Sequence, residues 1–178
     1  MQFAEASEQL TEAIRLDSTF AEAYLQRGKV RWMARGYSKA VDDLDRALAL
    51  DSTLGWAYFF RGSSLFAIDS LDLGLSDLER AAASGDLPAQ DRARAQRMRG
   101  IVFMQDEDFS AGVDALGAAI DLHPEHAFYY YERGLLLAAA GSNEEAAEDL
   151  ERFVRMDSTS ADALEHARST LDSLRTIE

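Results

Sequence analysis

Recurring arginines are the residues best placed for chemistry, because three of them are followed by an aspartate sixteen residues later. The pairs are Arg27 with Asp43, Arg61 with Asp77, and Arg133 with Asp149. A guanidinium and a carboxylate that meet inside a fold form a charge-assisted, often bidentate hydrogen bond. The constant spacing therefore predicts a structural ion pair in three similar segments. The competing interpretation is that these arginines bind a ligand.

Residues that usually carry catalysis or bind metals are scarce. The histidines are His123, His126 and His166, and the sequence has no cysteine. Two histidines in one turn fall short of the complete donor set that a metal ion needs. The sequence also lacks the phosphate-loop, dinucleotide-binding and nucleophile-elbow motifs. We therefore expect no enzymatic activity, no cofactor and no metal site.

The charge balance argues against two classes of partner. The 178 residues carry 18 Lys and Arg against 32 Asp and Glu, a net charge of −14. Nucleic-acid binding needs a basic surface that neutralises phosphates, and an acidic protein is also repelled by anionic lipids. No stretch approaches the roughly 18 apolar residues of a membrane span. The sequence favours the cytoplasm, although a trimmed signal or anchor would leave no trace.

The arginines belong to a repeat that sets the architecture of the chain. Each precedes a glycine, in Arg27-Gly28, Arg61-Gly62, Arg99-Gly100 and Arg133-Gly134, and the glycines are 34, 38 and 34 residues apart. A fixed period of this length is typical of helical repeat proteins. A glycine inside a helix costs about 1 kcal/mol relative to alanine. We therefore interpret each glycine as a point where a second helix approaches closely.

Each repeat contains two stretches with apolar residues at three- and four-residue steps, separated by a short break. In the first repeat, Tyr24 and Gly28 share one helix face, and Tyr37, Ala40 and Leu44 share another. Such spacing indicates two amphipathic helices that pack against each other. The expected helices span residues 2–16, 21–35, 37–50, 55–68, 71–84, 88–106, 109–122, 127–140, 143–156 and 160–175.

This pattern resembles the tetratricopeptide repeat, a helix–turn–helix unit with a period of 34 residues. The resemblance covers nearly the whole chain. The first-position tryptophan of the family appears here as Tyr24, Tyr58, Gln96 and Tyr130, and its loop proline survives as Pro124. The resemblance implies an all-α fold, a right-handed α-solenoid of antiparallel helix-turn-helix repeats with a C-terminal capping helix.

We expect one domain over residues 1–178, because each repeat of a solenoid buries its face against its neighbours. Residues 1–20 match the second half of a repeat, which indicates a truncated repeat in a segment cut from a longer protein. This first helix should expose an apolar edge around Phe3, Ala6 and Leu10. Complete repeats are expected at 21–54, 55–88, 93–126 and 127–160, with an insertion at 89–92 and a capping helix at 161–178.

A recurring turn precedes several of the expected helices. Its sequence is Asp-Ser-Thr, at residues 17–19, 51–53 and 157–159. Serine and threonine can accept hydrogen bonds from the free amides at a helix start. Thr19, with Glu22 three residues later, also matches a capping box. The turn therefore predicts that its Ser or Thr caps the next helix.

If the repeats stack as the resemblance implies, their first helices line a concave face. Aromatic residues anchor binding sites because they bury much area with few rotors to freeze. We expect a protein–protein interaction scaffold that binds a peptide or partner protein in an aromatic-lined groove, where two arginines would attract an acidic group. The groove residues are Leu25, Lys29, Trp32, Trp56, Phe59, Phe66, Arg94, Arg97, Ile101, Phe128 and Tyr131.

The alternative is a structural or self-associating repeat segment of a larger protein, with no peptide ligand of its own. In that case the groove or the apolar edge of the first helix would pair with a second copy, giving a homo-oligomer, or with another part of the parent chain. For the edge, that part would be an upstream segment, since exposed apolar patches favour such contacts.

Overall fold

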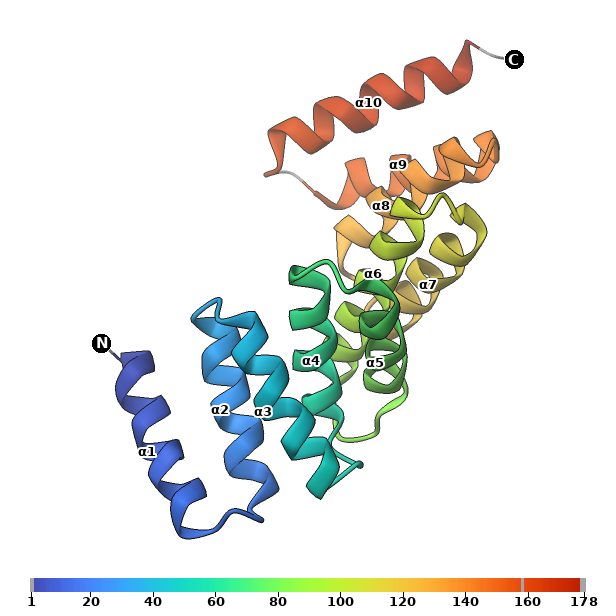
Figure 1. Cartoon of the computed structure of the whole chain (residues 1–178). Coiled ribbons are helices and arrows are strands. Elements are labelled where there is room, and N and C mark those ends of the chain that lie inside the picture. The colour runs from blue at the N-terminus through green and yellow to red at the C-terminus, as the bar shows by residue number, and fades with distance from the viewer. Residues whose placement is uncertain (1, 158, 177–178) are drawn as a thin grey trace. The chain divides into compact units, whose positions relative to one another are not determined.

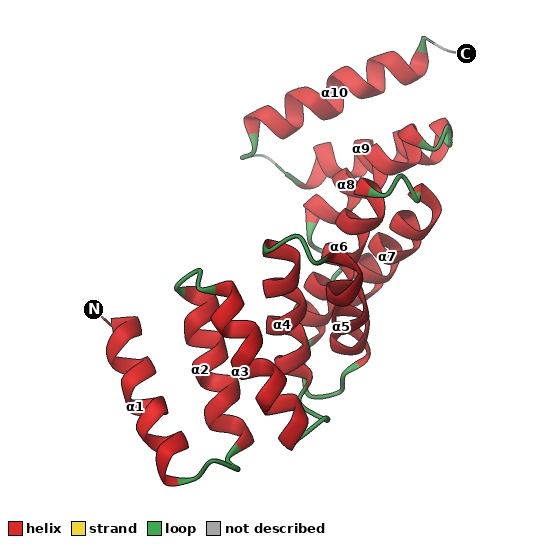
Figure 2. Cartoon of the chain, in the orientation of Figure 1, coloured by secondary structure: helices red, strands yellow, loops and turns green. Residues whose placement is uncertain are grey.

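The computed structural model describes residues 2–157 and 159–176, and the regular structure within them is entirely helical (Figures 1 and 2). The predicted all-α class is confirmed, and every helix end lies within two residues of its expected position. The helices are α1 (Gln2–Leu16), α2 (Ala21–Met33), α3 (Tyr37–Leu50), α4 (Gly55–Ala67), α5 (Leu71–Ala83), α6 (Ala89–Gln105), α7 (Phe109–Leu122), α8 (Ala127–Ala139), α9 (Asn143–Met156) and α10 (Ala161–Arg175).

The chain divides into two compact units, residues 1–88 and 89–178. Unit 1 contains α1 and the hairpins α2–α3 and α4–α5, and unit 2 contains the hairpins α6–α7 and α8–α9 followed by α10. The boundary falls where the sequence predicts the insertion. Helix α6 has 17 residues whereas α2, α4 and α8 have 13 each, so the inserted residues form an additional turn of α6.

The recurring glycine lies where the two helices of each hairpin cross. A Cβ atom on Gly28 would lie 2.7 Å from Cγ of Leu44, and one on Gly134 would lie 2.9 Å from Cγ of Leu150. Both leucines are completely buried. A side chain at either glycine would have to displace a tightly packed neighbour. The close approach inferred from the sequence is therefore correct.

Helix α10 completes the core of unit 2. Its Ala167, Leu171 and Leu174 join the buried cluster that contains Leu150 and Phe153 of α9. The opposite side of α10 is exposed and polar. An apolar stripe on one side and a polar surface on the other are what a terminal helix of a repeat array requires.

In the Asp-Ser-Thr turns the aspartate accepts the hydrogen bonds, whereas the serine or threonine was predicted to do so. Asp17 Oδ1 accepts hydrogen bonds from the amide and hydroxyl of Thr19, at 2.8 and 2.7 Å. The helix itself begins one residue later, with Phe20 at its N-cap and no side-chain cap. The predicted threonine cap is therefore wrong, because the threonine already satisfies the turn. Asp51 and Thr53 repeat the arrangement.

The third turn contains the same hydrogen bond from the threonine amide to the aspartate. Asp157 Oδ1 accepts from the amide of Thr159 at 2.8 Å, whereas Ser158 lies outside the described residues. Hydrogen bonds from Ser160 and Thr159 to the carboxylate lower the pKa of Asp157 to about 2. The aspartate of each turn thus accepts hydrogen bonds that stabilise the turn before the next helix.

Helix α1 has an uncovered apolar face. Phe3 is 45% exposed, and Ala6 and Leu10 are only partly buried. The residues 34 positions later, Ala40 and Leu44, are completely buried because α2 covers them. The apolar edge expected from the sequence is present.

Candidate functional site

An aromatic cluster in unit 1 is centred on Phe60 of α4. Trp56 stacks on Phe60 with ring centroids 5.5 Å apart, and Trp32 of α2 lies 5.2 Å from it on a tilted plane. Phe59 meets Phe60 edge-on at 5.4 Å. Phe60 is 5% exposed, whereas both tryptophans keep part of their surface accessible. We call Trp32, Trp56, Phe59 and Phe60 the aromatic cluster.

Lys29 adds one positive charge to this cluster. Its Nζ lies 5.8 Å from the Phe60 ring centroid, in cation–π range. Its ammonium forms no ion pair with another residue in the described part of the chain. Tryptophan surface beside an ammonium suits an apolar side chain accompanied by a carboxylate.

Burial separates the six groove residues predicted in unit 1 into two groups. Leu25 and Phe59 are 3% and 7% exposed, so they belong to the packed core. Lys29, Trp32, Trp56 and Phe66 keep accessible surface. Phe60 was missing from the predicted set although it organises the others. The run Trp56-Ala57-Tyr58-Phe59-Phe60 held a signal for it, since adjacent aromatic residues share a helix turn.

The predicted basic part of the groove is already paired within unit 2. Arg97 Nε lies 2.7 Å from Oε2 of Glu132, in a forked contact between α6 and α8. The hydrogen bond to Glu132 raises the pKa of Arg97. Arg94 pairs with Asp91 at 2.9 Å on the same helix. Neither arginine would meet an incoming acidic group without first giving up a carboxylate.

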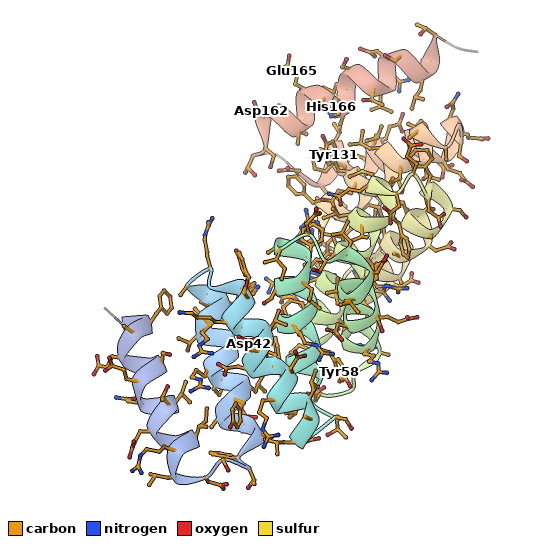
Figure 3. All side chains as sticks on the ribbon, in the orientation of Figure 1. Asp42, Tyr58, Tyr131, Asp162, Glu165 and His166 are labelled. Carbon is orange, nitrogen blue, oxygen red and sulfur yellow. The ribbon has the colours of Figure 1, made fainter. Side chains whose placement is uncertain are left out.

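The aromatic residues predicted in unit 2 form a second, smaller group. Phe128 and Tyr131 lie 5.4 and 4.9 Å from the ring of Phe153, and both are partly exposed. The Tyr131 hydroxyl is 2.7 Å from Nδ1 of His166, so α8 and α10 are linked at this point (Figure 3). Burial raises the pKa of Tyr131. Ile101, the remaining predicted residue, is partly buried.

Two histidines of unit 2 pack against an aromatic residue. His126 stacks on Tyr129 with centroids 4.2 Å apart and planes 13° apart, and His123 lies 5.5 Å from His126. Burial, followed by the charges of His123 and Arg97, lowers the pKa of His126. No group of three or more metal-ligating side chains occurs in the described part of the chain.

The three arginine–aspartate pairs predicted from the sequence occur inside their hairpins. Each arginine donates through Nε and Nη2 to both carboxylate oxygens, at 2.7–2.9 Å in all three pairs. The aspartates are 3–6% exposed. Hydrogen bonding to the aspartate is the main cause that raises the pKa of each arginine. The pairs join the two helices of a hairpin.

The third arginine nitrogen reaches the preceding repeat. Arg27 Nη1 donates to Thr11 at 3.0 Å, and Arg61 Nη1 donates to Asp45. At the same position before Arg133 stands Gly117, which has no side chain to offer. In unit 1 each arginine thus has a second side-chain acceptor in the preceding segment, a hydroxyl for Arg27 and a carboxylate for Arg61, whereas Arg133 in unit 2 has no side chain at that position.

Comparison with known proteins agrees with this architecture. A family model described as tetratricopeptide repeat matches residues 99–171. A crystal structure of MamA is 23% identical, with a TM-score of 0.80 over 86% of this chain and 88% of that one. A MamA fragment from Desulfovibrio magneticus RS-1 is 28% identical, with a TM-score of 0.76 over 86% and 85%.

A third similar structure is that of YrrB, described as a TPR protein with an unusual peptide-binding site. It is 23% identical, with a TM-score of 0.79 over 94% of this chain and 84% of that one. No curated protein matches the chain in sequence. The helical-repeat solenoid predicted from the sequence is confirmed, and neither the family nor these structures indicates a catalytic family. The described helices include none with the length and apolar character to cross a membrane.

Proposed function

We propose that this chain, which matches a tetratricopeptide-repeat model over residues 99–171 and shares the fold of such proteins, is an interaction scaffold. It binds a peptide segment of a partner protein on the first helices of unit 1. The aromatic cluster and Lys29 form the binding surface. The ligand carries an apolar or aromatic side chain next to a carboxylate, either that of an acidic side chain or that of a chain terminus. The binding surface reported for the similar protein YrrB supports a peptide as the ligand class.

The observation that carries this proposal is the partly accessible surface of Trp32 and Trp56 beside the buried ring of Phe60. Phe60 fixes the ring positions of Trp32 and Trp56 through contacts at 5.2 and 5.5 Å, so little side-chain entropy is lost on binding. Lys29 supplies a charge that attracts a carboxylate in a chain of net charge −14. Rigid aromatic anchors of this kind supply most of the energy at many interfaces.

A displayed library of short random peptides tests the proposal with the full chain as bait. Enriched peptides should pair an apolar or aromatic residue with an acidic residue or a free carboxyl terminus. Trp56→Ala should weaken the binding of an enriched peptide by about 30-fold, the loss expected for a hot-spot side chain of about 2 kcal/mol. Lys29→Glu should reverse the charge preference.

Phe128→Ala in unit 2 is the matched control, since it removes a partly exposed aromatic side chain on the equivalent helix. It should leave the affinity unchanged. Thermal unfolding followed by helical circular dichroism verifies that each variant stays folded. A library that enriches no sequence, or one that binds Trp56→Ala as tightly as the native chain, contradicts the proposal and leaves a structural or self-associating segment as the alternative.

A further inference from the structure

Unit 1 contains a hollow of about 320 Å³ between its two second helices, α3 and α5, and α4 packs against both of them. All three helices contribute to its apolar lining, through Val41, Leu65 and Leu73. Leu65 is 7% exposed, whereas Leu73 is 67% exposed. An apolar side chain that entered from outside would contact Leu65 and cover Leu73, and such burial is favourable by about 25 cal/mol per Å².

The corresponding hollow of unit 2 has nearly the same size and a different lining. Its volume is about 300 Å³, and Glu145 and Glu148 stand where unit 1 has Leu73 and Ser76. Both glutamates are exposed. An apolar side chain in this hollow would have to remove water from two carboxylates, which is costly without a counter-charge. Of the two hollows, the one in unit 1 therefore suits an apolar occupant.

The charged side chains around the hollow of unit 1 balance one another. Arg61 donates to both oxygens of Asp77 and to Asp45, and Arg80 is the second positive charge in the lining. The two arginines and the two aspartates cancel, so the lining has no net charge. A carboxylate from outside would meet Asp45, whose side chain is 58% exposed, and an ammonium would meet Arg80. An uncharged occupant avoids both repulsions.

Arg80 is held in place by Tyr58 and still has donors to offer. Its Nη1 donates to the Tyr58 hydroxyl at 2.8 Å, and its guanidinium carbon lies 5.2 Å from the centre of the Tyr58 ring. In the described part of the chain, Nε and Nη2 of Arg80 donate to no other group, and Oδ2 of Asp45 accepts from none. A donor and an acceptor therefore remain at the hollow. Each residue of a peptide backbone, proline excepted, carries one carbonyl and one N–H that match them.

We propose that this hollow is a docking site for a partner protein, separate from the aromatic cluster. An extended, uncharged segment of the partner inserts one leucine-sized side chain beside Leu65 and Leu73. A backbone carbonyl of the segment accepts from Arg80, and a backbone N–H donates to Asp45. A volume near 300 Å³ is at the lower end of the range for ligand sites, so the hollow takes one side chain and not a whole helix. This inference does not rest on the proposed peptide surface.

A displayed library of short random peptides tests the docking site, with the full chain carrying Trp56→Ala as bait. This bait lacks a tryptophan of the aromatic cluster, so the two proposals can fail separately. Enriched peptides should contain Leu, Ile or Met in an uncharged stretch. Adding Leu73→Glu to the bait should weaken an enriched peptide about tenfold, because a carboxylate then stands in the hollow as in unit 2. Arg80→Ala should also weaken it about tenfold, about 1.4 kcal/mol, through the loss of a charged hydrogen bond.

Met104→Glu is the matched control, since it makes the same kind of change at another exposed apolar residue, in unit 2. It should leave the affinity unchanged, and helical circular dichroism should show that every variant is folded. Replacing the leucine of an enriched peptide by alanine should weaken binding to the bait. The same replacement should have little effect once Leu73→Glu is present, because the two side chains no longer meet.

A library that enriches no uncharged apolar peptide overturns the proposal. Equal affinities for the bait with and without Leu73→Glu do the same, as do equal losses from Leu73→Glu and Met104→Glu. Sedimentation of the native chain examines the other occupant. A dimer that Leu73→Glu dissociates would assign the hollow to a second copy of this chain and not to a partner protein.

Discussion

Unit 1 and unit 2 share the same hairpin but use the surface of their first helices differently. In unit 1, Trp32 and Trp56 keep accessible area beside Lys29. In unit 2, Arg97 is held by Glu132 and Tyr131 by His166. A partner that binds unit 2 would have to compete with these internal bonds, and the gain from replacing an existing ion pair is small. Identical folds can therefore differ in binding capacity through the pairing of a few side chains.

The largest difference between the units should appear when an aspartate of an ion pair is removed. Breaking a buried pair costs about 3–5 kcal/mol, because the remaining charge is left without a partner. Asp149→Ala should lie near the lower end of that range, since the Arg133 side chain is 27% exposed. Asp77→Ala should cost less, because Arg61 keeps Asp45. Chemical denaturation measures both losses, and the opposite order would contradict the role assigned to Asp45.

Glu132→Gln should make unit 2 more similar to unit 1 by leaving Arg97 without its carboxylate. The change should lower the stability of unit 2 by about 1–2 kcal/mol, the scale of one charged hydrogen bond at a partly exposed site. Amide hydrogen exchange should quicken in α6 and α8 and stay unchanged in α2 and α4. Glu125→Gln, at an exposed position of the same unit, is the control. Equal protection of α6 and α8 in both variants would show that the pair contributes nothing.

Tyr131→Phe should remove the hydroxyl bond to His166 and little else. A hydrogen bond of this kind contributes about 1 kcal/mol net. The expected result is faster amide exchange in α10 with unchanged exchange in unit 1. Tyr37→Phe in α3 is the control for the loss of a tyrosine hydroxyl. If exchange in α10 does not change, the hydroxyl contact does not help to hold the helix.

The smallest expected difference is in the response to acid. Burial and the nearby charges of His123 and Arg97 lower the pKa of His126, so the unfolded chain protonates first as the pH falls through about 6.5. Unfolding then becomes easier, and unit 2 should lose stability between about pH 7 and about pH 5. Glu132 and Tyr129 also lie near this ring and enter the balance.

Unit 1 contains no histidine and should respond less over the same range. Limited proteolysis at the two pH values, with cleavage sites assigned to each unit, measures the difference. His126→Gln should remove most of the acid sensitivity of unit 2. Equal sensitivity of the native chain and this variant would exclude His126 as the cause.

The sequence predicted the helices well because each helix repeats one pattern of small and apolar residues. The glycine of the crossing and the leucine that packs on it are local, periodic signals, as in Gly28 and Leu44. The arginine–aspartate ion pairs were equally predictable from their spacing, because both partners lie in one hairpin. The threonine cap failed because the turn and the helix start differ by one residue, which periodicity does not resolve.

The surroundings of the proposed binding residues were harder to predict, because they depend on contacts between neighbouring repeats. Phe59 and Phe60 are adjacent in sequence, and neither periodicity nor composition says how far each is covered by the next helix. The pairing of Arg97 with Glu132 spans 35 residues, one more than the repeat period. Tyr131 and His166 have the same separation. Complementary residues one repeat plus one apart are therefore a usable signal for bonds between first helices.

The position of the two tryptophans has a spectroscopic consequence. The chain contains two, and both contact Phe60 in unit 1. Excitation at the red edge of the indole band therefore reports on unit 1 alone, although the emission is recorded from the whole protein. The shift of that emission follows the solvent exposure of the indole rings, so an unlabelled native chain carries its own local fluorophore. Its emission separates the unfolding of unit 1 from the loss of total helix.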